Sequence, residues 1–161
     1  RGDSCWARGL AWALYGFGTA YEYTRDPRFL ETACHCADFY LEHTPGGVPP
    51  WDYDAPPDSR AQPDSSAAAI AASGLWSLGG LAATRSRQLL YRQASLRIMD
   101  ALTSPEYLAS GTPGWEGILK RGVYHIHKGL GVDESVAWGE HFFVEALFKV
   151  LQGLEADEVM R

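Results

Sequence analysis

The sequence lacks a long apolar run, a basic cluster and an even set of cysteines. A membrane-spanning helix needs about 20 consecutive apolar residues, so we expect no membrane partner. The formal net charge of −6 and the missing basic run argue against a nucleic-acid partner. An acidic protein can still bind an acidic small ligand through one local cationic pocket.

Cysteine is scarce, and its spacing excludes two classes of protein. Three cysteines cannot form a closed disulfide framework. Cys34 and Cys36 flank His35. This pattern lacks the Cys-x-x-Cys spacing of a zinc site, and no second pair of ligands accompanies it. We therefore expect no metal, and we interpret these cysteines as buried small apolar side chains. Reduced thiols fit a reducing compartment, which favours a cytoplasmic location.

Hydrophobic periodicity predicts about five helices and one long loop. A cap of Ser, Thr, Asp or Asn marks the start of most of these segments. We place the caps at Asp3 or Ser4, at Asp26 before Pro27, at Asp64, and at Asp133-Glu134-Ser135. The predicted helices span residues 5–23, 28–43, 66–84, 86–102 and 136–151, with a loop at 44–63 and a turn-rich segment at 103–131.

A weak internal repeat predicts how these helices are arranged. Three segments that open on Asp-Ser or Asp-Glu-Ser are rich in small residues, and one amphipathic helix lies between each successive pair. Such alternation is typical of the inner and outer helices of a toroid. Inner helices of a toroid run in the same direction, so their first turns meet at one end. That end would gather Asp3, Asp64, Asp133 and Glu134 near Arg8.

The stretch from Trp6 to Gly16 contains the strongest candidate for a binding surface. In a helix, Arg8 and Trp12 stand four residues apart on one face. A guanidinium offers a planar fork to a carboxylate, and an indole offers a rigid apolar surface. The pair therefore suits a ligand with a carboxylate and an apolar face. The alternative is an arginine that extends over a buried aromatic ring for packing alone.

Three blocks of the sequence resemble the unsaturated glucuronyl hydrolases, glycoside hydrolase family 88. The first, Trp6-Ala7-Arg8-Gly9-Leu10-Ala11-Trp12, is similar to the family's Trp-x-Arg-Gly-Gln-Ala-Trp. The others are Asp64-Ser65-Ser66 with the Ala-rich run after it, and Gly122-Val123-Tyr124-His125 followed by Lys128 to Ser135 and Trp138-Gly139-Glu140. The resemblance implies an all-α fold, the C-terminal part of an (α/α)6 barrel. Residues 1–161 would form one partial toroid that lacks the N-terminal hairpins and leaves inner faces open.

The resemblance also implies an activity. Family members hydrate the C4=C5 double bond of an unsaturated uronic acid at the non-reducing end of an oligosaccharide, without a cofactor. Their catalytic Asp pair lies upstream of the Trp-x-Arg-Gly motif, so we expect no catalytic residue in this chain. The expected partner is an unsaturated uronic-acid oligosaccharide. The positions that match substrate-binding residues of the family are Trp6, Arg8, Trp12 and His125.

Other functions stay open at this point. Leu10 replaces the family's Gln, and unsaturated rhamnogalacturonyl hydrolases share the Trp-x-Arg-Gly core. A helical carbohydrate-binding or scaffold module without catalysis is a second alternative. Asp64, Asp133 and Glu134 are candidate acids, but an N-cap role explains each of them. The sequence gives neither the sugar linkage nor the oligomeric state.

Overall fold

The computed structural model describes residues 3–60 and 62–159. Within them lie five long helices, a four-residue helix and one antiparallel hairpin, so the mainly helical prediction is confirmed. The elements are α1 (Ala7–Thr24), α2 (Pro27–His43), α3 (Pro57–Arg60), α4 (Ser65–Leu81), α5 (Arg85–Leu102), β1 (Gly122–His125), the 3₁₀ turn η1 (Ile126–Lys128), β2 (Leu130–Glu134) and α6 (Ala137–Val159). No described helix has the length and apolar character that a membrane crossing requires.

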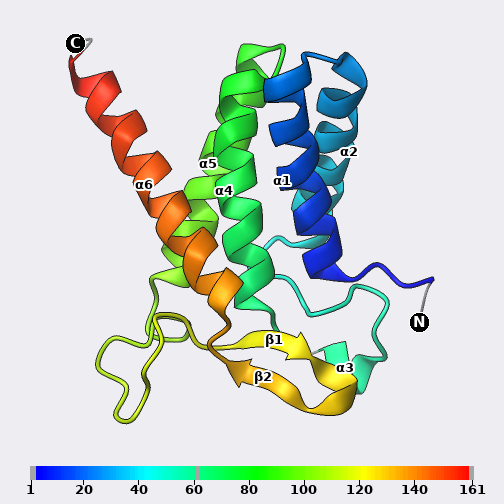
Figure 1. The fold of residues 1–161 in the computed structure, drawn as a ribbon, viewed down its shortest axis with the longest axis vertical. Helices are drawn as coiled ribbons and strands as arrows, with labels where there is room; N and C mark the ends of the chain where they lie inside the picture. The colour runs from blue at the N-terminus through cyan, green and yellow to red at the C-terminus, as the bar shows by residue number, and fades with distance from the viewer. Residues whose placement is uncertain (1–2, 61, 160–161) are drawn as a thin grey trace.

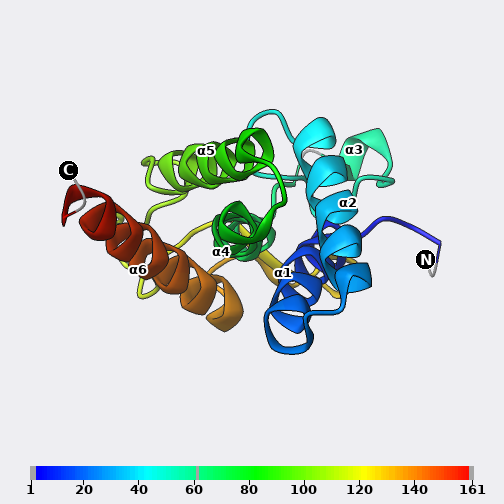
Figure 2. The same cartoon turned by 90° about the horizontal axis from the view of Figure 1, so that it is seen from above.

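The long helices form two layers (Figures 1 and 2). α1, α4 and α6 run in the same direction, with α4 between the other two, while α2 and α5 pack behind them in the opposite direction. The first turns of α1, α4 and α6 therefore meet at one end of the bundle, where the hairpin and the loop before α4 also lie. This is the arrangement of inner and outer helices that the repeat predicted.

Small residues let the central helix α4 lie close to both of its inner neighbours. Every residue of α4 from Ser65 to Leu75 is buried. A Cβ atom on Gly74 would collide with the Leu14 side chain and lie 3.1 Å from the Tyr15 Cα atom of α1. On the other side, a Cβ atom on Gly139 of α6 would lie 3.0 Å from Ser66 Cβ. Small residues at these positions therefore let the backbones of α1 and α6 approach α4 closely.

The outer helices bury one face each, as amphipathic helices do. Tyr40 of α2 is fully buried and donates its hydroxyl hydrogen bond to the Gly47 carbonyl at 2.8 Å. Tyr91 of α5 is fully buried and donates to Asp38 of α2 at 2.8 Å. All three cysteines are free thiols; Cys34 is buried, as predicted, whereas Cys36 is only partly buried and does not fit that interpretation.

Two of the predicted helix caps are confirmed. Asp26 accepts a hydrogen bond from the Arg28 amide, and Asp64 accepts one from the Ser66 amide, each at 3.0 Å. The cap at Asp3 or Ser4 is wrong, because α1 begins at Ala7. The Ala7 amide donates instead to the Trp51 carbonyl at 3.1 Å, so the loop backbone replaces a side-chain cap.

The predicted cap at Asp133-Glu134-Ser135 is also wrong. Asp133 and Glu134 belong to β2, which pairs with β1 as an antiparallel hairpin, and β1 lies within the segment that we expected to be turn-rich. The Ser135 hydroxyl donates to the Leu119 carbonyl at 2.5 Å and accepts from the Trp115 indole nitrogen at 2.8 Å. α6 begins at Ala137 and continues to Val159, eight residues beyond the predicted end at 151.

Replacing Gly74 with alanine should destabilise the protein. The added methyl group has no space between α4 and α1, and overpacking of this kind costs about 1–3 kcal/mol. Gly80 lies in the same helix with open space around its Cβ position. Gly80→Ala is therefore the matched control and should gain up to about 1 kcal/mol from helix propensity. Urea unfolding measures both, and equal stabilities would contradict the close packing of α4 on α1.

Candidate functional site

A cavity of about 560 Å³ opens at the end of the bundle where the inner helices begin. Its lining comes from three segments that are distant in the sequence: the entry to α1, the loop before α4, and the hairpin. The volume is in the range of small-molecule sites. The lining residues are Ser4, Trp6, Arg8, Trp51, Asp52, Asp54, Ala55, Pro56, Val123, Tyr124, His125, Ile126 and His127.

The loop before α4 is held against the entry to α1 by both its backbone and its carboxylates. Tyr53 donates its amide to the Cys5 carbonyl at 3.0 Å, and Asp54 accepts the Cys5 amide at 2.7 Å. Asp52 is buried and accepts the Ser4 hydroxyl at 2.7 Å and the Asp54 amide at 2.8 Å. The two pocket carboxylates therefore already hold internal donors.

Burial together with these two aspartates raises the pKa of the Cys5 thiol. The shift keeps Cys5 in its protonated form, and a thiol is a much weaker nucleophile than a thiolate. Cys5 itself is not among the residues that line the cavity.

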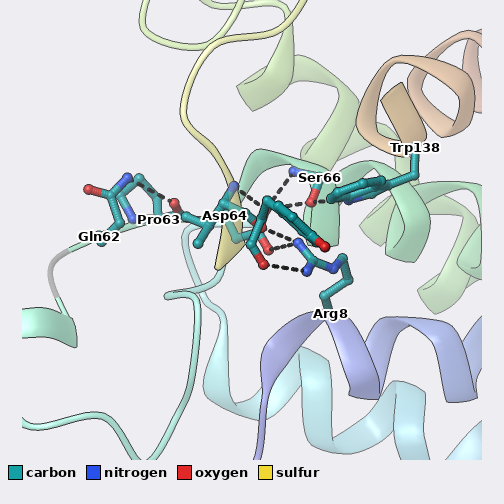
Figure 3. Close-up of polar contacts among 8 residues, drawn as sticks. Arg8, Gln62, Pro63, Asp64, Ser66 and Trp138 are labelled. Carbon is teal, nitrogen blue, oxygen red and sulfur yellow. Dashed lines mark hydrogen bonds and ion pairs between the residues drawn. The ribbon is translucent and has the colours of Figure 1, made fainter. Parts of the chain in front are cut away.

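Arg8 and Asp64 form a buried ion pair beneath the pocket (Figure 3). Arg8 is only 4% exposed and Asp64 is fully buried. Arg8 Nη1 lies 3.4 Å from Asp64 Oδ2 and also donates to the Val123 carbonyl, while Nη2 donates to the Tyr124 carbonyl at 3.0 Å. The pair thereby connects α1, the first turn of α4, and β1.

Two indole rings enclose the guanidinium of Arg8. Its central carbon lies 4.5 Å from the ring centroid of Trp6 and 4.8 Å from that of Trp138 on α6. Each such contact adds about 0.5–2 kcal/mol, more where water is excluded. Burial lowers the pKa of Arg8, and the charge of Asp64 opposes that shift. Burial likewise raises the pKa of Asp64, against the hydrogen bonds from Ser66 and the charge of Arg8.

The structure brings together three of the four residues that the sequence singled out. Trp6, Arg8 and His125 all line the cavity. Trp12 does not; it lies farther along α1, is 37% exposed, and packs edge-on against Phe142 of α6 with centroids 5.0 Å apart. Leu10, which replaces the family's Gln, packs against the core instead of lining the cavity.

Several lining residues were not among the predicted site residues. Tyr124 is 53% exposed, and its ring lies 5.5 Å from that of Trp138. Trp51 is buried against the hairpin, and its ring meets that of His127 edge-on at 5.3 Å. Tyr53 packs the loop onto α2 and shares a hydrogen bond of 2.6 Å with Thr44. The aromatic content of the loop at 44–63 was the signal in the sequence, but it did not distinguish Trp51 from Tyr53.

The loss of one partner of the buried ion pair should be costly. Arg8→Met leaves the Asp64 carboxylate buried without its cation, which costs about 3–5 kcal/mol in comparable cases. Adding Asp64→Asn to Arg8→Met should cost less than the sum of the two single changes, because the second removes the uncompensated charge. The half-exposed pair Arg121–Glu106 is the control, with an expected coupling below about 1 kcal/mol. Urea unfolding of each double-mutant cycle gives the couplings, and a negligible value for Arg8 and Asp64 would contradict the pairing.

Comparison with known proteins gives consistent relatives over nearly the whole chain. No protein-family model matches. The chain is 36% identical over 148 residues to an unsaturated glucuronyl hydrolase from Formosa agariphila, covering 90% of this chain and 36% of that protein. The crystal structure of the Bacillus sp. GL1 unsaturated glucuronyl hydrolase, described as responsible for glycosaminoglycan degradation, superimposes with a TM-score of 0.85 at 34% identity, covering 94% of this chain and 40% of that one.

A further solved structure carries a bound ligand. It is a mutant of the Streptococcus agalactiae unsaturated glucuronyl hydrolase in complex with dGlcA-GalNAc6S. It superimposes with a TM-score of 0.84 at 28% identity, covering 93% of this chain and 40% of that one. The chain thus spans about two fifths of the length of the relatives it matches.

Proposed function

Because this chain belongs to the unsaturated glucuronyl hydrolases, we propose that it contributes the substrate-binding end of such an enzyme. The complete protein would hydrate the C4=C5 double bond of an unsaturated uronic acid at the non-reducing end of an oligosaccharide. It would thereby release that sugar from oligosaccharides made by polysaccharide lyases. Residues 1–161 would form one part of a helical toroid, and the remaining hairpins would come from elsewhere in the protein.

The observation that carries this proposal is the composition of the cavity. Trp6, Arg8 and His125 line it together, although α1 and the hairpin lie far apart in the sequence. An indole face suits the apolar face of a sugar ring, and a buried cation favours a carboxylate nearby. Trp12 stands one turn farther along α1 and is partly exposed, so we assign it to a second part of the same surface.

The proposed chemistry needs one carboxylic acid close to the double bond. A proton adds to C4 and the oxygen of a water molecule adds to C5, which gives a hemiketal. The hemiketal then opens and the glycosidic bond to the rest of the oligosaccharide breaks. The residues of this chain would orient the sugar for that step.

We place the proton donor outside residues 1–161. Asp64 is fully buried and does not line the cavity. The Asp52 side chain already accepts hydrogen bonds from the Ser4 hydroxyl and the Asp54 amide, and the Asp54 side chain accepts one from the Cys5 amide. Neither Asp133 nor Glu134 lines the cavity. The chain supplies walls and a buried cation, but its carboxylates are already engaged or lie elsewhere.

The relatives favour a substrate of the glycosaminoglycan type. One relative is described as responsible for glycosaminoglycan degradation and another binds dGlcA-GalNAc6S. The rhamnogalacturonyl alternative depended on Leu10, which packs against the core and does not line the cavity. The non-catalytic alternative has no support among the relatives, which are named as hydrolases.

The test follows the ultraviolet absorbance of the conjugated enol ether as an unsaturated chondroitin disaccharide is consumed. We expect the absorbance to fall with the complete polypeptide encoded by the same gene, and to stay constant with residues 1–161 alone. A saturated disaccharide is the substrate control, and circular dichroism establishes that each protein is folded.

Each outcome bears on a different part of the proposal. Turnover by residues 1–161 alone would move the proton donor into this chain, with Asp52 and Asp54 as the first candidates. A folded complete protein that leaves the absorbance unchanged would overturn the hydrolase assignment.

A further inference from the structure

Asp64 makes more contacts than a helix cap requires. An N-cap needs one hydrogen bond to an amide near the start of its helix, which Asp64 has from Ser66 at 3.0 Å. Its Oδ1 also accepts the Ser66 hydroxyl at 2.6 Å and the Val123 amide at 3.2 Å, and its Oδ2 faces Arg8 (Figure 3). Among the described residues, the side chain of the comparable cap Asp26 accepts hydrogen bonds only from Arg28, two residues along the chain.

Asp64 and Arg8 together hold both backbone groups of one residue of β1. Val123 donates its amide to Asp64, and its carbonyl accepts from Arg8. Arg8 also binds the carbonyl of the next residue, Tyr124, at 3.0 Å. The strand is therefore fixed to the first turns of α1 and α4 through its backbone, independently of its side chains.

This fixed stretch of β1 is also a wall of the cavity. Val123, Tyr124 and His125 are consecutive lining residues. Arg8 in turn sits between the rings of Trp6, which lines the cavity on the opposite segment, and Trp138. A shift of Asp64 would therefore displace the hairpin and the indole of Trp6 relative to each other.

We propose that Asp64 is a positioning residue for substrate binding, acting through Arg8 and Val123 to fix the distance between Trp6 and the hairpin. This inference rests on the proposed function. Asp64 is fully buried and is not a lining residue, so its effect on substrate is indirect. A wall that is fixed before the substrate arrives lowers the entropy cost of binding.

The test is Asp64→Asn in the complete protein, with unsaturated chondroitin disaccharide as substrate. Asparagine caps helices as well as aspartate does but carries no charge for Arg8. We expect KM to rise by about tenfold or more while kcat changes by less than about threefold, because the wall binds the sugar equally before and during the reaction and the reacting acid is untouched. Asp26→Asn is the matched control: it alters a cap of the same geometry on α2, far from the cavity, and should leave both constants unchanged.

A second measurement follows the wall directly. Hydrogen exchange of the Val123 amide should accelerate by about tenfold or more in Asp64→Asn and stay constant in Asp26→Asn. If Asp64→Asn does not fold, Ser66→Ala is the milder variant, since it removes one hydrogen bond to Asp64 and one from Trp138. We then expect KM to rise as well, but by a smaller factor.

The outcomes separate this inference from the proposed function. No turnover by the unmutated complete protein would overturn the hydrolase proposal and with it this role. Turnover with an unchanged KM in folded Asp64→Asn, or an equal loss of kcat in Asp64→Asn and Asp26→Asn, would overturn the positioning role alone.

Discussion

The end of the bundle that carries the cavity depends on one buried cation. Arg8 is surrounded by Trp6, Trp138, the Asp64 carboxylate and two carbonyls of β1. A buried charge without partners would cost several kcal/mol. Removing one partner of Arg8 therefore increases the free-energy cost of removing another. Four elements contribute to this one group. The positions of these elements relative to one another, and so the shape of the cavity, depend on the contacts that the Arg8 guanidinium makes.

The packing of α4 makes that convergence possible. Because its first half is almost all Ala and Ser, α1 and α6 lie close on either side and bring Arg8 and Trp138 to the same place. Larger residues on α4 would separate the two helices and leave the guanidinium between only one ring and water. The run of small side chains thus acts on the site without lining it.

Periodicity and capping signals predicted the helices and the common direction of the inner three, because both depend on residues close in sequence. They missed the hairpin, since Asp133 and Glu134 look like a cap until the pairing of β2 with β1 is known. The resemblance singled out Trp6, Arg8, Trp12 and His125, and all of these except Trp12 line one cavity. It could not reveal that the hydrogen bonds of Arg8 go to Val123 and Tyr124, because those partners are set by tertiary contacts across the chain.

The hairpin is held firmly at β1 and only weakly at its tip. β1 is held at Val123 and Tyr124 by buried polar contacts, whereas Lys128, Gly129 and Leu130 at the tip are exposed. Local fraying can therefore begin at the tip and stop at β1, because going farther requires separating α1 from α4. Val123 and Tyr124 line the cavity, so this part of its wall can open only together with the bundle. That stretch of wall therefore keeps its shape even where the tip of the hairpin frays.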